Sequence, residues 1–360
     1  MITMKKIAAI LLTALTVTGA TAQQTKILTA DKHNEYGLVY TLPNTALRIT
    51  MTATRTVKQA GPYWQYAKKY IGTDNVVRND AEQWQLTGVK VEQYGVSDTE
   101  TQYLMQLKPG AMTYISVGDD NMLLAINKEV AGSKLAPAEE EDRFGENHDM
   151  REYLGYVDED FISSQSTAKQ AQMLASNLME VREAKVALSR GTAETMPTDG
   201  RQLELMLGSL AKQEKAFTAA FAGLVRTDTV TRVFTYIPGE ADKATLCRFS
   251  DFAGFVEPDD YAGDPLTIAV TDKKFAELPT DDKGETKKLP KDAVMYRIPG
   301  TAKVTLSLNG KRLWSREGEY AQYGVDFGLQ PTLFSDRRAR SYAIFDTATG
   351  ALKEIGEVTE

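Results

Sequence analysis

Cysteine and histidine are scarce in this sequence of 360 residues. It has one cysteine, Cys247, and two histidines, His33 and His148. A single cysteine excludes an internal disulfide, and two histidines argue against a histidine-rich zinc site. A nucleophilic cysteine needs a histidine partner, and neither histidine lies in a supporting motif. Cys247 is therefore interpreted as a buried, inert thiol.

Reaction motifs are also missing. The sequence contains no G-x-S-x-G elbow, no P-loop, no G-x-G-x-x-G after a predicted strand and no HExxH. No cofactor is expected. A carbohydrate-active hydrolase needs only two suitably spaced carboxylates, so that class stays open.

Long hydrophobic runs are confined to the N-terminus. Lys5 and Lys6 precede the apolar stretch 7–17, and Ala20-Thr21-Ala22 forms a small-x-small site. This pattern predicts a signal peptide over residues 1–22, with cleavage before Gln23. The stretch is short for a membrane span, so no transmembrane segment is expected in the mature chain. No cysteine follows it, which predicts a soluble periplasmic or extracellular protein and not a lipoprotein.

The charge balance is acidic. The net charge is −7, and loss of the two signal-peptide lysines makes it −9. Nucleic-acid binding needs a basic footprint, so no nucleic-acid partner is expected. Attraction to an anionic membrane surface is likewise not expected.

Two amphipathic helices are predicted near the middle of the chain, over residues 167–190 and 198–223. Asp199 suits the N-cap of the second helix, and Gly191 and Gly223 suit the two C-terminal ends. The short link between the helices favours an antiparallel pair. We expect their apolar stripes to face neighbouring sheets. Those stripes comprise Leu174, Leu178, Val181, Lys185 and Leu188 in the first helix, and Leu203, Leu207, Leu210, Phe217 and Phe221 in the second.

Strand patterns lie on both sides of the helices. Leu47, Ile49 and Met51 alternate with polar residues, as in a half-buried strand, and Pro43-Asn44 before them indicates a turn. The predicted fold class is α+β, with antiparallel β-rich N- and C-terminal portions and a central two-helix antiparallel hairpin. The predicted domains are a mainly-β unit over 23–163, the helical hairpin over 164–225 and a second mainly-β unit over 226–360.

A weak internal echo joins the two β-rich portions. The run YTLPNTA at 40–46 resembles YRIPGTA at 296–302, and 234–239 is a partial third copy. The apolar alternation after the motif slips by one residue between the first two copies, which reverses the faces. The echo is therefore interpreted as a recurring strand–turn device, with true duplication as the alternative.

A dense aromatic cluster gives the first candidate site. Tyr63, Trp64, Tyr66 and Tyr70 lie in a short helix that follows Gly61-Pro62. Exposed rings of this kind stack on sugars, so the four residues are candidate ligand-binding residues. The alternative is that they cover a sheet as part of the core.

Acidic residues give the second candidate. Asp259, Asp260 and Asp264 could hold a cation through oxygen ligands. Aspartate is equally suited to tight turns, which is the alternative interpretation. A separate acidic run at 139–142 lies in a stretch, 131–150, that we expect to be a solvated and disordered insertion.

Three long runs carry a family resemblance: PTDGRQLELMLGSLAKQEKAFTAAFAG at 197–223, VFTYIPGE at 233–240 and FDTATGALKEI at 345–355. Through them the chain resembles domain-of-unknown-function family 4831, uncharacterised secreted proteins of Bacteroidota. The resemblance implies an exported α+β protein of gut-type anaerobes. It implies no activity, so no functional residue is carried over.

Three functions are compatible with these observations. The first is a non-catalytic binding or scaffolding protein of the cell envelope, with a glycan or an envelope protein as partner. The second is a hydrolase that uses paired carboxylates. The third is a subunit of an envelope assembly that docks through the helical hairpin.

Overall fold

The structure is a computed structural model that describes residues 24–27, 37–106, 114–132, 135, 137, 139–335 and 340–358. The fold is α+β, as predicted, and combines antiparallel sheets with a pair of long helices. The predicted signal peptide, its cleavage site and His33 lie outside the described residues. None of the described helices is both long and apolar enough to cross a membrane.

The elements follow the chain in this order: β1 (Gln24–Ile27), β2 (Leu38–Gln59), η1 (Trp64–Tyr66), α1 (Ala67–Ile71), β3 (Ala81–Gln106), β4 (Ile115–Val117), β5 (Leu123–Ile126), β6 (Asp142–Arg143), η2 (Glu152–Tyr156), α2 (Glu159–Ser163), α3 (Thr167–Arg190), α4 (Gly200–Ala222), β7 (Leu224–Tyr236), β8 (Lys243–Ser250), β9 (Gly254–Val256), β10 (Asp264–Lys274), β11 (Val294–Leu308), β12 (Lys311–Leu329), α5 (Thr332–Ser335), β13 (Ser341–Phe345) and β14 (Leu352–Glu357).

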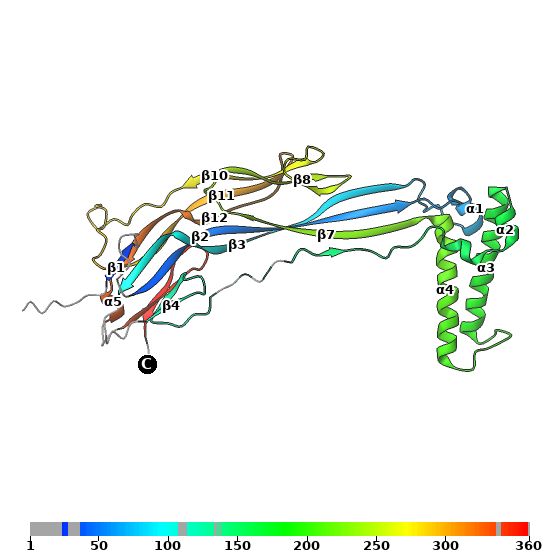
Figure 1. Cartoon of the computed structure of the whole chain (residues 1–360), viewed down its shortest axis with the longest axis horizontal. Coiled ribbons are helices and arrows are strands. Elements are labelled where there is room, and N and C mark those ends of the chain that lie inside the picture. The colour runs from blue at the N-terminus through cyan, green and yellow to red at the C-terminus, as the bar shows by residue number, and fades with distance from the viewer. Residues whose placement is uncertain are drawn as a thin grey trace, which may run out of the picture.

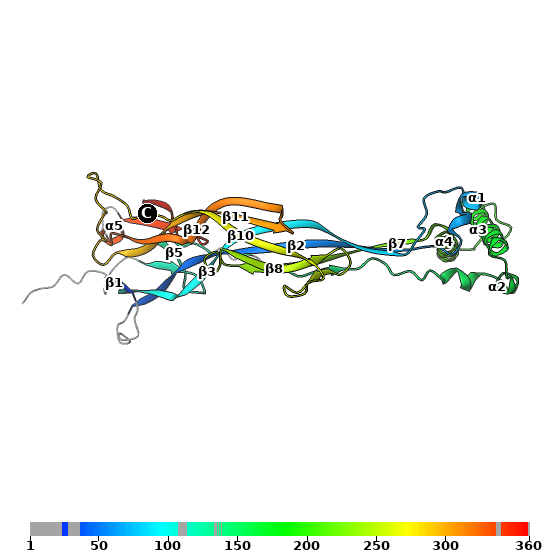
Figure 2. The same cartoon turned by 90° about the horizontal axis from the view of Figure 1, so that it is seen from above.

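The molecule is long and narrow (Figures 1 and 2). The sheets form a body at one end, a ribbon of β2, β3 and β7 leaves it, and the helices form a head at the other end. A 22-residue strand such as β2 extends about 70 Å. The C-terminus lies in the body, far from the head (Figure 1).

Strands from before and after the helices share two of the three sheets. The first sheet has the order β1-β3-β2-β7-β6, and the smallest has the order β14-β13-β5-β4. The remaining sheet, β12-β11-β10-β8-β9, comes entirely from the part after the helices. The predicted domain boundaries at residues 163 and 225 therefore separate segments of sequence that pair with each other in the body, and the division into domains stays a prediction.

Strand β2 is continuous where the sequence predicted a turn. Pro43 lies inside the strand, at a register shift against β3 between Thr41 and Pro43. A proline removes one ladder hydrogen bond, and an irregularity of this kind accommodates it without ending the strand. The predicted turn at Pro43-Asn44 is therefore wrong.

The predicted alternation in β2 is confirmed. Leu47, Ile49 and Met51 are buried between the first sheet and the sheet of β8 to β12, while Arg48 and Thr50 are only half-buried. The alternation ends after Ala53, and residues 54–59 are half-buried or exposed. The face of the ribbon that carries Leu47, Ile49 and Met51 is therefore covered by the second sheet near the body. Towards the head, this face has no such cover among the described residues.

The head has a core of its own. Helices α3 and α4 occupy the predicted ranges to within two residues, with Ser166 and Asp199 as N-caps. Their buried residues pack on one another and on the short helices, through Tyr63, Tyr153 and Phe161. The expectation that the hairpin faces neighbouring sheets is wrong, because the hairpin projects across the end of the ribbon (Figure 1).

The acidic stretch after residue 138 is also ordered differently from the expectation. Asp142–Arg143 forms β6 against β7, and the Glu141 carbonyl accepts from the Thr231 amide at 3.1 Å. Asp142 pairs with Arg232 at 2.7 Å. These bonds fix the segment along the outer edge of β7, so it is not a free insertion.

Candidate functional site

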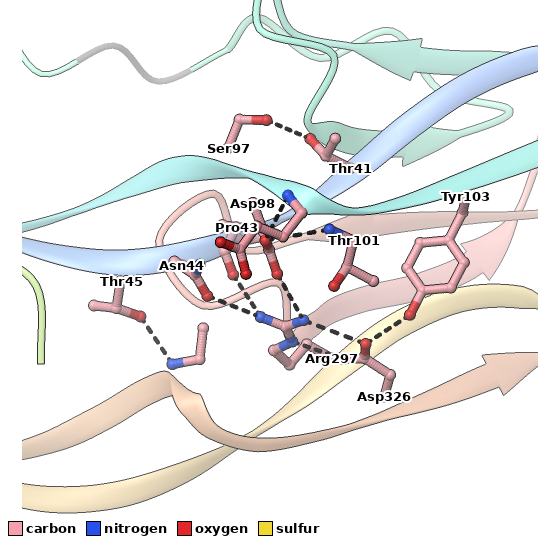
Figure 3. A network of polar contacts seen from close by, with 12 residues as sticks. Thr41, Pro43, Asn44, Thr45, Ser97, Asp98, Thr101, Tyr103, Arg297 and Asp326 are labelled. Atoms are coloured by element: carbon pink, nitrogen blue, oxygen red, sulfur yellow. Dashed lines mark hydrogen bonds and ion pairs between the residues drawn. The ribbon is translucent and has the colours of Figure 1, made fainter. Parts of the chain in front are cut away.

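A buried polar junction lies in the body, where the two echo motifs meet (Figure 3). The Arg297 guanidinium, on β11, donates to both Asp326 oxygens at 2.6 and 3.2 Å. It also donates to the Pro43 carbonyl at 3.0 Å and to Asn44 Oδ1 at 3.2 Å, both on β2. Asp98 completes the ring of acceptors at 3.7 Å. One side chain therefore links β2, β3, β11 and β12.

Hydrogen-bonded tyrosines support the junction on one side. The Tyr103 hydroxyl donates to Asp326 Oδ2 at 2.6 Å, and its ring stacks on that of Tyr40. The Tyr40 hydroxyl in turn accepts from the Met295 amide at 2.9 Å. Burial, together with the bond to Asp326, raises the pKa of Tyr103. Both phenols stay protonated at neutral pH, as donors in a fixed network.

A tight turn in the C-terminal tail packs against the same polar junction. Asp346 Oδ1 accepts from the amides of Ala348 and Thr349 at 2.9 and 3.0 Å. The Ala348 carbonyl accepts from the Thr45 hydroxyl at 2.8 Å. At Gly95 of β3, a Cβ would come within 1.9 Å of the Thr347 carbonyl oxygen. The tail run 345–355 is therefore clamped between β2, β3 and β11.

The junction is suited to holding sheets together and not to chemistry. The Arg297 guanidinium has acceptors on all its sides, and the Asp326 oxygens are both engaged. A fully buried carboxylate elsewhere, Asp228, is held in the same way by Arg55, Arg226 and the Gly145 amide. Carboxylates held by arginine in this manner fix structure.

The aromatic candidates lie in the head, at the end of the ribbon. Tyr63 is buried against Tyr153, Phe161 and Phe221, so its ring belongs to the core of the head. The remaining three rings, Trp64, Tyr66 and Tyr70, are partly exposed. Cations lie near two of them: Arg78 is 6.0 Å from the ring of Trp64 and Lys69 is 4.8 Å from the ring of Tyr70. The proposed ligand-binding role of these rings stays a prediction.

The aspartate candidates lie outside the head, in the loop from β9 to β10. Asp260 Oδ1 accepts from the Ala262 amide at 2.9 Å, which is an Asx turn, and Asp264 opens β10. Asp259 is exposed beside them. Across the part of the chain that the structure describes, no three histidine, cysteine or acidic side chains are placed to hold a metal ion. The metal role stays a prediction, and the turn accounts for Asp260.

Cys247 lies in β8 with its thiol in the sandwich core. It is 4% exposed, and burial raises its pKa to about 12. The thiolate is the reactive form of cysteine, so the folded protein keeps this group inert near neutral pH. His148 is remote from it, on the edge of the ribbon, where it contacts Glu146 and Lys215.

The helices of the head, which the sequence offered as a docking element in the third candidate function, carry many of the exposed apolar side chains. The described residues include eighteen exposed large apolar side chains, and ten of them lie between Phe144 and Val225. That span makes up only about a quarter of the described residues. Leu205 is 68% exposed in α4, Val186 is 47% exposed in α3 and Ile162 is 65% exposed in α2. Apolar exposure concentrated in this way is typical of an interaction surface.

A hollow lies between the two helices, near the tip of the hairpin. It measures about 520 Å³, and its lining is mainly apolar. The floor comprises Ala184, Ala187, Leu188, Met206, Ser209 and Leu210. Leu210, which lines the hollow, and Leu203 and Leu207 of the same predicted stripe are only half-buried, whereas Phe217 and Phe221 are fully buried nearer the ribbon. The tip of the hairpin therefore leaves part of its apolar stripe without a partner.

Comparisons with known proteins agree with the resemblance read from the sequence. A search of curated proteins and a search of solved structures each gave no match. The scan against protein families matched residues 36–353, which include the runs at 197–223 and 233–240 and all but the last two residues of the run at 345–355. The chain therefore belongs to the family described as domain of unknown function (DUF4831).

Proposed function

We propose that this protein is a non-catalytic scaffolding component of the cell envelope that binds its partner through the helical head. The concentration of exposed apolar side chains between Phe144 and Val225 carries the proposal. Phe144 and Val225 lie along the ribbon, and the other eight lie in the short helices and the hairpin of the head, which is the end of the molecule farthest from the body (Figure 1). The body then serves to hold the head at a distance.

Export and origin are part of the proposal. The basic pair Lys5-Lys6, the apolar run and the small-x-small site support cleavage before Gln23 and a location in the periplasm or on the cell surface. The family resemblance supports an origin in the Bacteroidota. A chain with one buried cysteine needs no disulfide there, because its three separate cores supply the burial.

The experiment uses photo-crosslinking in intact cells of the native host. A photoreactive phenylalanine analogue replaces Leu205 in one variant and Phe252 in another. Both positions are highly exposed, at 68% and 82%, but Phe252 lies in the body. We expect adducts from position 205 and none from position 252, in the envelope fraction, with a mature protein that begins at Gln23. Adducts from position 252 alone, or a cytoplasmic protein, would refute the proposal.

A glycan is the second candidate partner, because Trp64, Tyr66 and Tyr70 present partly exposed rings on the same head. Stacking on a sugar ring would change the fluorescence of Trp64. A titration with envelope oligosaccharides tests this, with Trp64→Phe as the control that should abolish the signal.

A further inference from the structure

The two sides of the seam between α3 and α4 are built differently. On one side, Glu214 of α4 bridges to Arg182 and Lys185 of α3 at 2.9 and 2.6 Å. These charge pairs cover the seam and satisfy one another within the chain. The opposite side holds the hollow described above, where small side chains such as Ala184, Ala187 and Ser209 leave apolar surface uncovered.

Charges around the hollow are sorted by sign. On the α3 side, Glu180 stands four residues before Ala184 and Glu183 four before Ala187, which places both on that rim. Glu194 lines the hollow from the loop at its tip. On the α4 side, Lys212 follows Ser209 by three residues, and Arg201 precedes the exposed Leu205 by four. The α3 rim is mainly acidic, with Arg190 seven residues after Glu183 as its one cation, and the α4 rim is basic.

The named charges on the two rims form no ion pairs among the described residues. Among the described residues, no ion pair involves Glu180, Glu183, Glu194, Arg201 or Lys212. Their side chains are exposed. This contrasts with the closed side of the seam, where Glu214 has two cationic partners. The open side thus presents an apolar hollow between two unpaired rims of opposite charge.

We propose that the hollow is covered by the same face of a second copy of this chain, so that two hairpins form a four-helix bundle. The inference rests on the proposed function, in which the head is the binding end. A two-fold axis parallel to the helices places α3 of one copy over α4 of the other, so each acidic rim meets a basic rim. The exposed Met206 of each copy then points towards the partner's hollow.

The heights of the charges agree with this axis. A two-fold axis parallel to the helices keeps every residue at its own height, and the Glu214 bridges place that residue level with Arg182 and Lys185. Lys212 lies two residues from Glu214, a rise of about 3 Å. Glu183 of one copy is therefore within reach of Lys212 of the other.

A charge swap tests the arrangement. The mature chain, residues 23–360, is examined by sedimentation equilibrium, and we expect a dimer. Glu183→Lys and Lys212→Glu should each weaken dimerisation about tenfold or more, because each reverses two symmetry-related contacts. The double variant should restore the wild-type affinity. Glu204→Lys, which changes the charge on the opposite rim of α4, is the matched control and should leave the dimer intact.

A second variant tests the hollow. Ala187→Glu puts a carboxylate into the apolar floor and should give a monomer with the helical circular dichroism of the wild type. A wild-type chain that stays monomeric at high concentration, or a dimer that resists all these variants, would overturn the second-copy inference. A monomer whose position 205 crosslinks to a different protein would reject only this inference. A monomer without adducts at position 205 would also remove the proposed function.

Discussion

Replacement of Arg297 by methionine should be among the most destabilising single changes in the body. The side chain is only 9% exposed and its partner Asp326 is 22% exposed. The change leaves the Asp326 carboxylate, the Pro43 carbonyl and Asn44 without their donor. Removal of one member of a buried ion pair typically costs about 3–5 kcal/mol, and we expect a loss in that range in the free energy of unfolding.

The matched control is Arg143→Met. Arg143 donates two bonds of 2.7 Å to Glu141, a geometry as good as that of Arg297, but the two side chains are 73% and 55% exposed. An exposed pair contributes less than about 1 kcal/mol. The two arginines therefore separate the effect of burial from that of hydrogen-bond geometry.

Urea unfolding measures both variants, with fluorescence and circular dichroism compared to check that one transition is being followed. The double variant Arg297→Met, Asp326→Leu should lose less than the sum of the single losses, because it removes both charges together. A loss below about 1 kcal/mol for Arg297→Met, equal to that of the control, would show that the junction does not hold the sheets as described.

Two further predictions concern the hairpin and the tail. Hydrogen bonds from Lys185 and Arg182 lower the pKa of Glu214, so the stability that this residue contributes is present above the ordinary glutamate pKa of about 4.5 and is lost as pH falls through the lowered value. Thermal melts followed by the helical signal should therefore show a smaller loss of melting temperature in acid for Glu214→Gln than for the wild type. Equal losses in the two proteins would contradict a stabilising role of the Glu214 ion pairs. Gly95→Ala should destabilise the body, because its Cβ would meet the Thr347 carbonyl oxygen at 1.9 Å, whereas Gly208→Ala, with nothing within 4 Å, should stabilise α4 by about 0.5–1 kcal/mol. The opposite order of the two melting temperatures would refute this account of the tail.

Local signals predicted the elements well. The apolar period and the caps at Asp199 and Gly191 placed both long helices, and alternation placed the buried face of β2 at Leu47, Ile49 and Met51. These features depend on neighbours within a few residues, so one sequence suffices to predict them.

Packing between segments far apart in the chain was harder to predict from the sequence. The Pro43 motif indicated a turn, but its partner lies some 250 residues away, where Arg297 donates to the Pro43 carbonyl. The echo between 40–46 and 296–302 was a usable signal, because the two copies meet at this junction. Register shifts of the same kind lie at the proline of each copy, between Thr41 and Pro43 and between Ile298 and Gly300.

The sequence offered the hairpin as a docking element but did not show which part of its surface stays uncovered. An amphipathic stripe predicts that a helix buries one face, but it does not identify the partner. The stripe through Leu203, Leu207 and Leu210 was assigned to the sheets, whereas the structure leaves it half-covered at the tip. Which charges stay unpaired, such as Glu183 and Lys212, can be judged only when the packing of α3 against α4 is known.

The ribbon determines how a mechanical force on the head reaches the body. The chain crosses between body and head four times: out along β2, back along β3, out along the segment after β6 and back along β7. A pull on the head would therefore run parallel to the strands and load their hydrogen bonds together in shear, instead of opening them one after another. The ribbon would therefore resist extension along its length, and a force from a partner bound at the tip of the hairpin would be carried to the sheets of the body.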